Sequence, residues 1–198
     1  MDEFKKMLAG EQYNPSDNNL SLMRARARKL IDKFNHSSFE EEESRLKLLK
    51  SLLGKAGDNI SIHQNFYCDY GCNIYVGSNF FANYDCVILD CAEVHFGDNC
   101  LLGPQVGIYT ATHPLDPIKR ASGLESAKPI HIGNDCWIGG HATINPGVTL
   151  GNNAVVASGS VVTKSFGDNL VIGGNPARVI RELKCSLDTT PEDKDVKQ

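Results

Sequence analysis

The hydrophobic positions between Ile132 and Thr163 recur every six residues. The aliphatic residues that mark this period are Ile132, Ile138, Ile144, Leu150, Val156 and Val162, and the residues four places after them are mostly small: Cys136, Ala142, Val148, Ala154 and Ser160. A helix would place apolar residues at i+3, i+4 and i+7, and an amphipathic strand would place them at every second position. A period of six instead predicts a short strand followed by a sharp corner, with the aliphatic side chain facing inward.

One such unit cannot bury its aliphatic side chain alone, so successive units must stack into coils that share one core. Pro146 and the many glycines of the repeat argue against a helix. The period is also present earlier in the chain, where it slips by two residues after Val94. Its earlier members are Val76, Ala82, Ile88, Val94, Phe96, Leu102 and Ile108. The pattern predicts a mainly β fold over residues 56–176.

The flanking segments have other patterns. Residues 1–55 carry apolar side chains at helical spacing, from Leu20 to Phe34 and again from Leu46 to Leu53, and predict an N-terminal helical segment. The repeat stops over residues 109–129, which hold three prolines, so we expect an inserted loop there that is either functional or disordered. Residues 177–184 are predicted to form a short C-terminal helix, and the polar residues 185–198 a disordered tail.

Composition narrows the functional class. The chain has 198 residues and a net charge of -4, which does not favour nucleic acid as a partner. The first ten residues lack the apolar core of a signal peptide, and no apolar run approaches the roughly 18 residues of a membrane span.

The seven cysteines include no CxxC pair. Cys86, Cys100 and Cys136 fall at the small place of the repeat, so we interpret them as buried side chains in a reducing cytoplasm.

Among the six histidines, His113 differs from the others by its position. His113 lies in the loop that interrupts the repeat, and Pro114 restricts its backbone toward extended conformations. A histidine has a free pKa of about 6.5 and can act as a general base near neutrality. The remaining histidines are interpreted as solvent-facing residues. The residues alone leave the role of His113 open.

Several segments together resemble the hexapeptide-repeat acyltransferases of the maltose/galactoside O-acetyltransferase type. They are Asp69-Tyr70-Gly71, Asn79-Phe80-Phe81-Ala82-Asn83, Tyr109-Thr110-Ala111-Thr112-His113-Pro114, Trp137-Ile138-Gly139-Gly140, Asn145-Pro146-Gly147-Val148, Val162-Thr163-Lys164 and Gly174-Asn175-Pro176-Ala177-Arg178. The resemblance spans roughly residues 3–184. It implies a left-handed parallel β-helix of triangular section, assembled as a homotrimer with active sites between subunits. It also implies acetyl-CoA as the donor substrate and no metal.

The resemblance implies direct transfer of the acetyl group to a hydroxyl of a sugar such as maltose or glucose, with His113 as the general base. Asn83, Asp69, Asp90 and Arg24 match positions that bind the acceptor. Some family members carry the carboxylate of Asp90 one residue later, where this chain has Cys91. An aspartate of the galactoside enzymes aligns with Pro15, which argues against a galactoside acceptor.

The resemblance also implies a donor site. Its matching residues are Trp137, Gly140, Ser158, Thr163, Lys164, Arg178 and Arg181. On the predicted C-terminal helix, Arg178 and Arg181 are three residues apart and would share one face, suited to the phosphates of coenzyme A. Trp137 falls at an outward place of the repeat, so we expect it beside the pantetheine arm or at a subunit contact.

Three alternatives remain open from the sequence. The acceptor could be a galactoside, a lipo-oligosaccharide or another hydroxyl compound. A metal-dependent hydratase on the same scaffold would require three zinc-binding histidines, for which His113, His131 and His141 are the candidates. A non-catalytic trimeric scaffold would need neither His113 nor the donor residues.

Overall fold

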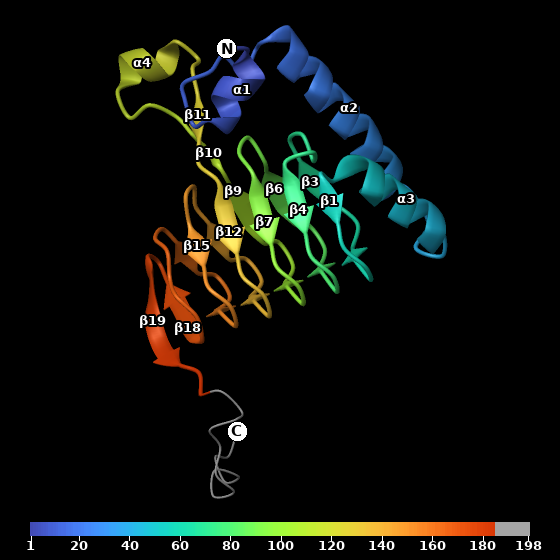
Figure 1. Cartoon of the computed structure of the whole chain (residues 1–198), viewed down its shortest axis with the longest axis vertical. Coiled ribbons are helices and arrows are strands. Elements are labelled where there is room, and N and C mark those ends of the chain that lie inside the picture. Colours follow the sequence, from blue (N-terminus) through green and yellow to red (C-terminus); the bar gives the residue numbers. More distant parts are fainter. Residues whose placement is uncertain (185–198) are drawn as a thin grey trace, which may run out of the picture.

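Short parallel strands stack into a triangular prism, which the computed structural model describes over residues 1–184 (Figure 1). The predicted disordered tail, residues 185–198, lies outside the described residues. The first face of the prism consists of β1 (Lys55–Ala56), β4 (Ile74–Val76), β7 (Val94–Phe96), β12 (Ile130–Ile132) and β15 (Thr149–Leu150). The third face consists of β3 (Tyr67–Cys68), β6 (Val87–Leu89), β9 (Gly107–Tyr109), β14 (Thr143–Ile144) and β17 (Val161–Val162).

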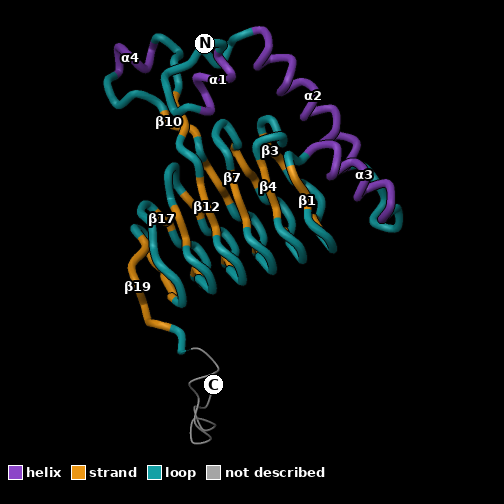
Figure 2. The backbone as a smooth tube through the Cα atoms, viewed as in Figure 1, coloured by secondary structure: helices purple, strands orange, loops and turns teal. Residues whose placement is uncertain are grey.

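The second face is longer than the other two. It consists of β2 (Ser61–Ile62), β5 (Phe81–Ala82), β8 (Leu101–Leu102), β13 (Trp137–Ile138), β16 (Val155–Val156), β18 (Leu170–Gly174) and β19 (Ala177–Glu182). The predicted parallel β-helix is confirmed, since the chain visits the three faces in turn and returns to the first one coil later (Figure 2).

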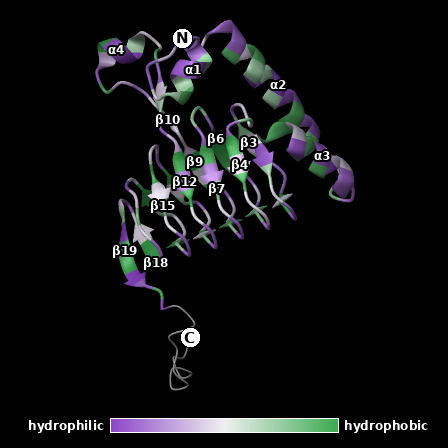
Figure 3. Cartoon of the chain, in the orientation of Figure 1, coloured by the Kyte–Doolittle hydropathy of each residue, from purple (hydrophilic) through white to green (hydrophobic). Residues whose placement is uncertain are grey.

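The core runs along the axis of the prism. All six aliphatic residues that mark the period between Ile132 and Val162 are at most 3% exposed, as the pattern predicts. Cys86, Cys100 and Cys136 are also buried and unpaired, which confirms them as small apolar side chains. Figure 3 shows hydrophobic residues on strands of the prism such as β4, β6 and β9, and also along the helices α2 and α3. Each coil buries its aliphatic residues only because its neighbours cover them.

The edge between the first and second faces carries Asn and Asp side chains that form hydrogen bonds between neighbouring coils. Asn79, Asn99, Asp135, Asn153 and Asn169 all have a left-handed backbone, which asparagine and aspartate tolerate better than most residues. Asn79 Nδ2 donates to Asn99 Oδ1 at 2.9 Å, and Asn99 Nδ2 donates to Asp135 Oδ1 at 2.8 Å. This edge is therefore structural.

Extra residues gather at one edge only. Between the third and first faces the chain takes eight residues from Cys68 to Val76, and eight again from Ile88 to Phe96, where six suffice elsewhere. The next passage holds the whole insertion 109–129. It forms an arm with the antiparallel strands β10 (Ala111–Thr112) and β11 (Ser126–Ala127) and the helix α4 (Pro117–Ala121), as Figure 1 shows. The two-residue slip in the sequence repeat therefore corresponds to two extra residues that widen this corner of the prism.

The predicted N-terminal helical segment is confirmed as α1 (Glu3–Leu8), α2 (Asn18–Asn35) and α3 (Glu42–Leu52). Asp17 caps α2 by accepting hydrogen bonds from the backbone N–H groups of Asn19 and Leu20. Ile31 and Phe34 from α2 join Leu49 and Leu52 from α3 in the core of the prism, so these helices close its open end. Within residues 1–184, none of the helices combines the length and the hydropathy needed to cross a bilayer.

The predicted C-terminal helix is wrong. Residues Ala177–Glu182 form β19, which runs antiparallel to β18 and completes the second face. Strand β18 would otherwise present an unpaired row of backbone groups, and the adjacent β-branched residues Val179 and Ile180 favour a strand. Gly174 has a positive φ of 98° at the turn that reverses the chain. The local pattern suggested a helix, but the free edge of the sheet decided the structure.

Candidate functional site

Most of the predicted site residues lie on two edges of the prism, one on each side of the third face, whereas Arg24 lies on α2 and Trp137, Arg178 and Arg181 lie on the second face. The first edge joins the third face to the first face, and we call it the His113 edge. It carries Asp69, Asp90, His113, Thr163 and Lys164. The second edge joins the second face to the third, and we call it the Asn83 edge. It carries Asn83, Gly140 and Ser158. Within one chain the structure keeps these two sets of residues apart.

His113 projects from the arm of the His113 edge, with its side chain 55% exposed. Its Nε2 atom lies 4.0 Å from Glu125 Oε1. The other carboxylate oxygen of Glu125, Oε2, accepts a hydrogen bond of 2.8 Å from the Tyr13 hydroxyl. The imidazole therefore faces both solvent and a carboxylate that is itself held in place.

Tyr13 fastens the N-terminal segment to the arm. It is fully buried, and its backbone exchanges two hydrogen bonds with Glu125, at 3.0 and 3.1 Å. Burial raises the pKa of Tyr13, and the neighbouring Cys91 and Glu125 raise it further, so the phenol stays protonated and donates. A small second core surrounds it, with Met7, Leu20 and Ala127. The position of Glu125 is thus set by a segment more than a hundred residues away in sequence.

Asp69 lies beside Cys91 on the same edge. The Cys91 thiol donates to Asp69 Oδ2 at 3.4 Å. Burial raises the pKa of Asp69, whereas the Cys91 hydrogen bond and the positive charges of Arg24 and Arg28 lower it in part. Arg24 is held by hydrogen bonds to the Tyr70 hydroxyl at 2.7 Å and the Pro15 carbonyl at 2.6 Å. Asp69 thus lies within the influence of the Arg24 charge and also of Glu125, the carboxylate that faces His113.

Asp90 is corrected from an acceptor-binding residue to a structural one. Its side chain is fully buried. Oδ1 accepts from the backbone N–H groups of Asp69 and Tyr70 at 3.0 and 2.8 Å, and Oδ2 accepts from that of Asn73 at 3.3 Å. These bonds hold the widened corner of the preceding coil, and they leave no path for a ligand to reach the carboxylate.

The buried Asp90 predicts a pH-dependent stability. Burial raises the pKa of Asp90 from 3.8 to about 7, partly opposed by the backbone hydrogen bonds. The folded form therefore holds a proton that the unfolded chain releases, so this stabilisation is present below about pH 4 and is lost as the pH rises to about 7. We expect the free energy of unfolding to fall by about 3 kcal/mol from this group between pH 5 and pH 8.

Urea unfolding of the wild type and Asp90→Asn at both pH values checks this prediction. The variant cannot titrate at this position, so its free energy of unfolding should change less between pH 5 and pH 8 than that of the wild type. An equal change in both proteins would contradict the assignment to Asp90.

The Asn83 edge borders an exposed apolar surface. Asn83 Oδ1 accepts from the backbone N–H of Tyr84 at 2.8 Å, which fixes the plane of its amide. Trp137 is 54% exposed on the second face, between Leu101 and Val155 of the neighbouring coils, as its outward place predicts. Together with Ser158 and Arg181, Trp137 lines a cavity of about 350 Å³. A cavity of that size can hold part of a small ligand.

Arg178 and Arg181 lie on strand β19 and not on the predicted helix. In a regular strand, two residues three positions apart point to opposite faces. A β-bulge changes this, because the register shifts between Val171 and Ile172. Arg178 pairs with Gly173 and Arg181 with Val171, two residues apart on β18, so both arginines share one face after all. Thr163 and Lys164 lie on the His113 edge, away from this pair.

The Asn83 edge also offers a backbone donor. Gly139 N–H donates to the Val156 carbonyl at 2.8 Å, whereas the structure records no partner for Gly140 N–H within residues 1–184. Among the same residues, no three His, Cys, Asp or Glu side chains form a metal-binding group, so the set His113, His131 and His141 does not converge in the chain.

Sequence reasoning missed Glu125, Tyr13 and the contact of Cys91 with Asp69. Glu125 lies in the insertion, where no motif surrounds it. Tyr13 lies in the N-terminal segment, whose pattern predicts helices and indicates nothing about a site. A pairing between residues so distant in sequence leaves no local pattern. Only the fold of the arm onto the N-terminal segment reveals it.

Comparison with known proteins agrees with this architecture. Residues 6–57 match the family model described as maltose acetyltransferase hexapeptide capping motif, and residues 129–164 match the hexapeptide repeat of succinyl-transferase. The galactoside O-acetyltransferase of Escherichia coli (strain K12) is 40% identical over 179 residues, covering 90% of this chain and 88% of that protein.

Solved structures give the same result. A maltose O-acetyltransferase from Clostridium difficile 630 is 47% identical, with a TM-score of 0.92 over 93% of this chain and 98% of that one. A galactoside acetyltransferase in complex with coenzyme A is 40% identical, with a TM-score of 0.90 over 93% of this chain and 92% of that one. The left-handed parallel β-helix expected from the sequence is the fold of this group, and the chain belongs to the maltose/galactoside O-acetyltransferase family of hexapeptide-repeat acetyltransferases.

Proposed function

We propose that the protein transfers an acetyl group from acetyl-CoA to a hydroxyl of a sugar such as maltose or glucose. The observation that carries the proposal is the position of His113, an exposed imidazole 4.0 Å from the Glu125 carboxylate and on the same edge of the prism as Asp69. The named activities of the relatives, which include maltose and galactoside acetyltransferases, support the same reaction class.

The mechanism follows from the chemistry of the two substrates. A sugar hydroxyl is a poor nucleophile, so His113 takes its proton as the oxygen attacks the thioester carbonyl. The resulting tetrahedral oxyanion is stabilised by a backbone donor, for which Gly140 N–H is the candidate. The carbon–sulfur bond then breaks, the sulfur of coenzyme A leaves and accepts the proton from the imidazolium, and the acetyl ester is released. No acetyl-enzyme is required.

The two separated edges are the basis for proposing a homotrimer. In a closed ring of three copies, the His113 edge of one subunit meets the Asn83 edge of the next, which completes both the acceptor site and the donor site. The arm supports this arrangement, because Leu115 and Ile118 at its tip are 94% and 83% exposed. Large apolar side chains at the end of a protruding arm are typical of a subunit contact.

For the donor, we propose that Trp137, Gly140, Ser158, Arg178 and Arg181 act from one subunit and Thr163 and Lys164 from the neighbour. The cations are suited to the phosphates of coenzyme A. Relatives crystallised with coenzyme A or with acetyl-coenzyme A support acetyl-CoA as the donor. We also propose a cytoplasmic location, which the six unpaired cysteines within residues 1–184 support.

An acceptor panel tests the proposed function. Thiol release from acetyl-CoA is measured with glucose, maltose, a thiogalactoside, a lipo-oligosaccharide and a non-sugar alcohol. We expect the highest kcat/KM with glucose or maltose. Preference for the thiogalactoside or the lipo-oligosaccharide would replace the acceptor, and no release with any compound would favour a non-catalytic scaffold.

We further propose that Glu125 positions His113 and stabilises the imidazolium that forms during attack. Glu125→Gln is expected to lower kcat about 10- to 100-fold, because the charge of a carboxylate 4.0 Å from Nε2 would no longer stabilise the imidazolium, with little change in the KM for acetyl-CoA. Glu93→Gln is the matched control, because Glu93 Oε2 lies 2.9 Å from Nε2 of a different histidine, His95, which belongs to β7 of the first face. Equal kcat values for the two variants would contradict the role of Glu125.

A further inference from the structure

Cys91 carries a buried thiol that the proposed reaction does not use. It is 5% exposed, and its side chain interacts with those of both Asp69 and Tyr13. Burial raises the pKa of the Cys91 thiol, and the charge of Asp69 raises it further. The thiol therefore keeps its proton at neutral pH and acts neither as a nucleophile nor as a base. The role left to it is to donate a hydrogen bond.

Two carboxylates lie in this part of the His113 edge, and each has a neutral donor of its own. The Tyr13 hydroxyl donates to Glu125 Oε2 at 2.8 Å, and the Cys91 thiol donates to Asp69 Oδ2 at 3.4 Å. The two carboxylates repel each other, so the charge of Glu125 raises the pKa of Asp69. A hydrogen bond to the ionised form opposes that effect without adding a charge to the site.

The cations near Asp69 do not replace this donor. Arg24 donates to the Tyr70 hydroxyl at 2.7 Å and not to Asp69. Arg24 and Arg28 therefore lower the pKa of Asp69 by their charges alone. In the part of the chain that the structure describes, the Cys91 thiol is the one recorded hydrogen-bond donor to the Asp69 carboxylate.

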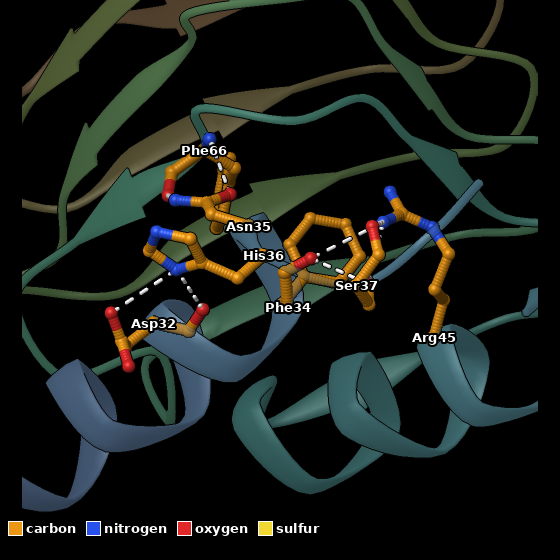
Figure 4. Close-up of polar contacts among 7 residues, drawn as sticks. All are labelled: Asp32, Phe34, Asn35, His36, Ser37, Arg45 and Phe66. Atoms are coloured by element: carbon orange, nitrogen blue, oxygen red, sulfur yellow. Dashed lines mark hydrogen bonds and ion pairs between the residues drawn. The ribbon is translucent and has the colours of Figure 1, made fainter.

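Helix α2, which carries both arginines, is fixed at its C-terminal end. Asn35 donates from Nδ2 to the Phe66 carbonyl at 3.0 Å and accepts from the Phe66 backbone N–H at 3.1 Å, which ties the helix to the first coil (Figure 4). The fold thus sets how far the positive charges of α2 lie from Asp69. Loss of the Cys91 thiol would leave Asp69 Oδ2 without a direct donor.

Three further ionisable groups interact with Asp69. The neighbouring side chains of Cys68 and Tyr70 are buried, which raises the pKa of both, so they keep their protons at neutral pH and add no charge. Asp90 Oδ1 accepts from the Asp69 backbone N–H at 3.0 Å. Asp90 is present in every variant of Cys91, so its titration is common to all of them.

We propose that Cys91 is a positioning residue, whose thiol orients the Asp69 carboxylate and keeps it ionised so that it accepts a hydroxyl of the sugar. The inference rests on the proposed function and deepens it, because it assigns the group that makes Asp69 a hydrogen-bond acceptor. The thiol holds Oδ2, whereas Oδ1 has no recorded partner among residues 1–184. Oδ1 is therefore the atom that meets the acceptor.

The test is the kcat/KM for maltose, measured by thiol release between pH 5 and pH 8. We expect Cys91→Ala to lower it about three- to tenfold at pH 8, the contribution of one hydrogen bond, through a higher KM for maltose. The deficit relative to the wild type should grow as the pH falls, because Asp69 without this donor takes up a proton at a higher pH. Both proteins contain His113, so its titration cancels in the ratio of their kcat/KM values.

Two further variants separate the hydrogen bond from packing. Cys91→Val fills the space without a donor and should show the same growing deficit as Cys91→Ala. Cys91→Ser restores a donor and should stay close to the wild type at every pH. Cys100→Ala is the matched control, because Cys100 is also buried but its thiol donates to the Gly133 carbonyl at 3.1 Å, on the edge between the first and second faces.

The outcomes separate the two proposals. Wild-type kcat/KM in Cys91→Ala and Cys91→Val would overturn the positioning role. A deficit that does not change with pH, or an equal deficit in Cys91→Ser, would reduce Cys91 to a packing residue and would also overturn it. Each of these results leaves the acetyltransferase intact. Absence of thiol release by the wild type with maltose would instead count against the proposed function and would remove the positioning role with it.

Discussion

Replacing His113 with alanine is expected to lower kcat by about 10²- to 10⁴-fold, the range over which a positioned general base accelerates a reaction. The hydroxyl of the acceptor would then have to lose its proton to water. Among residues 1–184, the arm offers no second imidazole to take over this role. The KM for acetyl-CoA should stay nearly unchanged, because His113 is not one of the proposed donor-binding residues.

His131→Ala is the matched control for this experiment. His131 is exposed on the first face, where its ring stacks on His95 at 5.0 Å, so its loss removes an imidazole without touching either edge. Circular dichroism and the oligomeric mass should match the wild type in both variants, since His113 is exposed and supports no core contact. Activity of His113→Ala within a few-fold of the wild type would remove His113 as the base.

The fold could be predicted from the sequence because its determinant is local and repeated. Every six-residue unit repeats the same requirement for one aliphatic residue inside and one small residue at the corner. The period can therefore be recognised even where a single position departs from the pattern. The C-terminal strand was missed because β19 owes its conformation to the open edge of β18, which no pattern within residues 177–184 encodes. Arg178 and Arg181 still share a face, through a bulge and not through helical spacing.

From the sequence, site residues could be proposed only where they lie in a short segment that resembles a family motif. His113, Asn83 and Asp69 lie in segments that resemble a family, and the structure places each at an edge of the prism. Asp90 shows the limit of this reasoning, because an acidic residue next to a binding position turned out to be a buried acceptor for three backbone N–H groups. Tyr13 and Glu125 meet only in three dimensions, so no spacing along the chain could reveal their hydrogen bond.

The second large effect concerns the assembly. His113 and Asn83 lie on opposite sides of the third face, so we expect each site to take His113 from one subunit and Asn83 from its neighbour. His113→Ala and Asn83→Ala should therefore both impair every site of their own homotrimers. In trimers that mix the two chains, a site regains both groups when the imidazole comes from the Asn83→Ala chain and the amide comes from the His113→Ala chain. A closed ring of three that contains both chains has this pairing at one of its sites, whichever chain is in excess, so about one third of the sites in mixed trimers are restored.

Co-expression of the two variants with different tags, and tandem purification of the mixed oligomers, measures this directly. Wild-type chains carrying the same two tags, purified in the same way, give the reference activity. The His113→Ala homotrimer gives the background, and a mixture of the two homotrimers that have not exchanged chains controls for residual Asn83→Ala activity.

The recovery of acetyl transfer in the mixed oligomers is the most direct test of a catalytic site shared between copies of this chain. We predict about a third of the wild-type rate per chain, with a KM for acetyl-CoA equal to that of the wild type. Mixed oligomers no more active than the unexchanged mixture of homotrimers would contradict a site built from the His113 edge of one subunit and the Asn83 edge of the next.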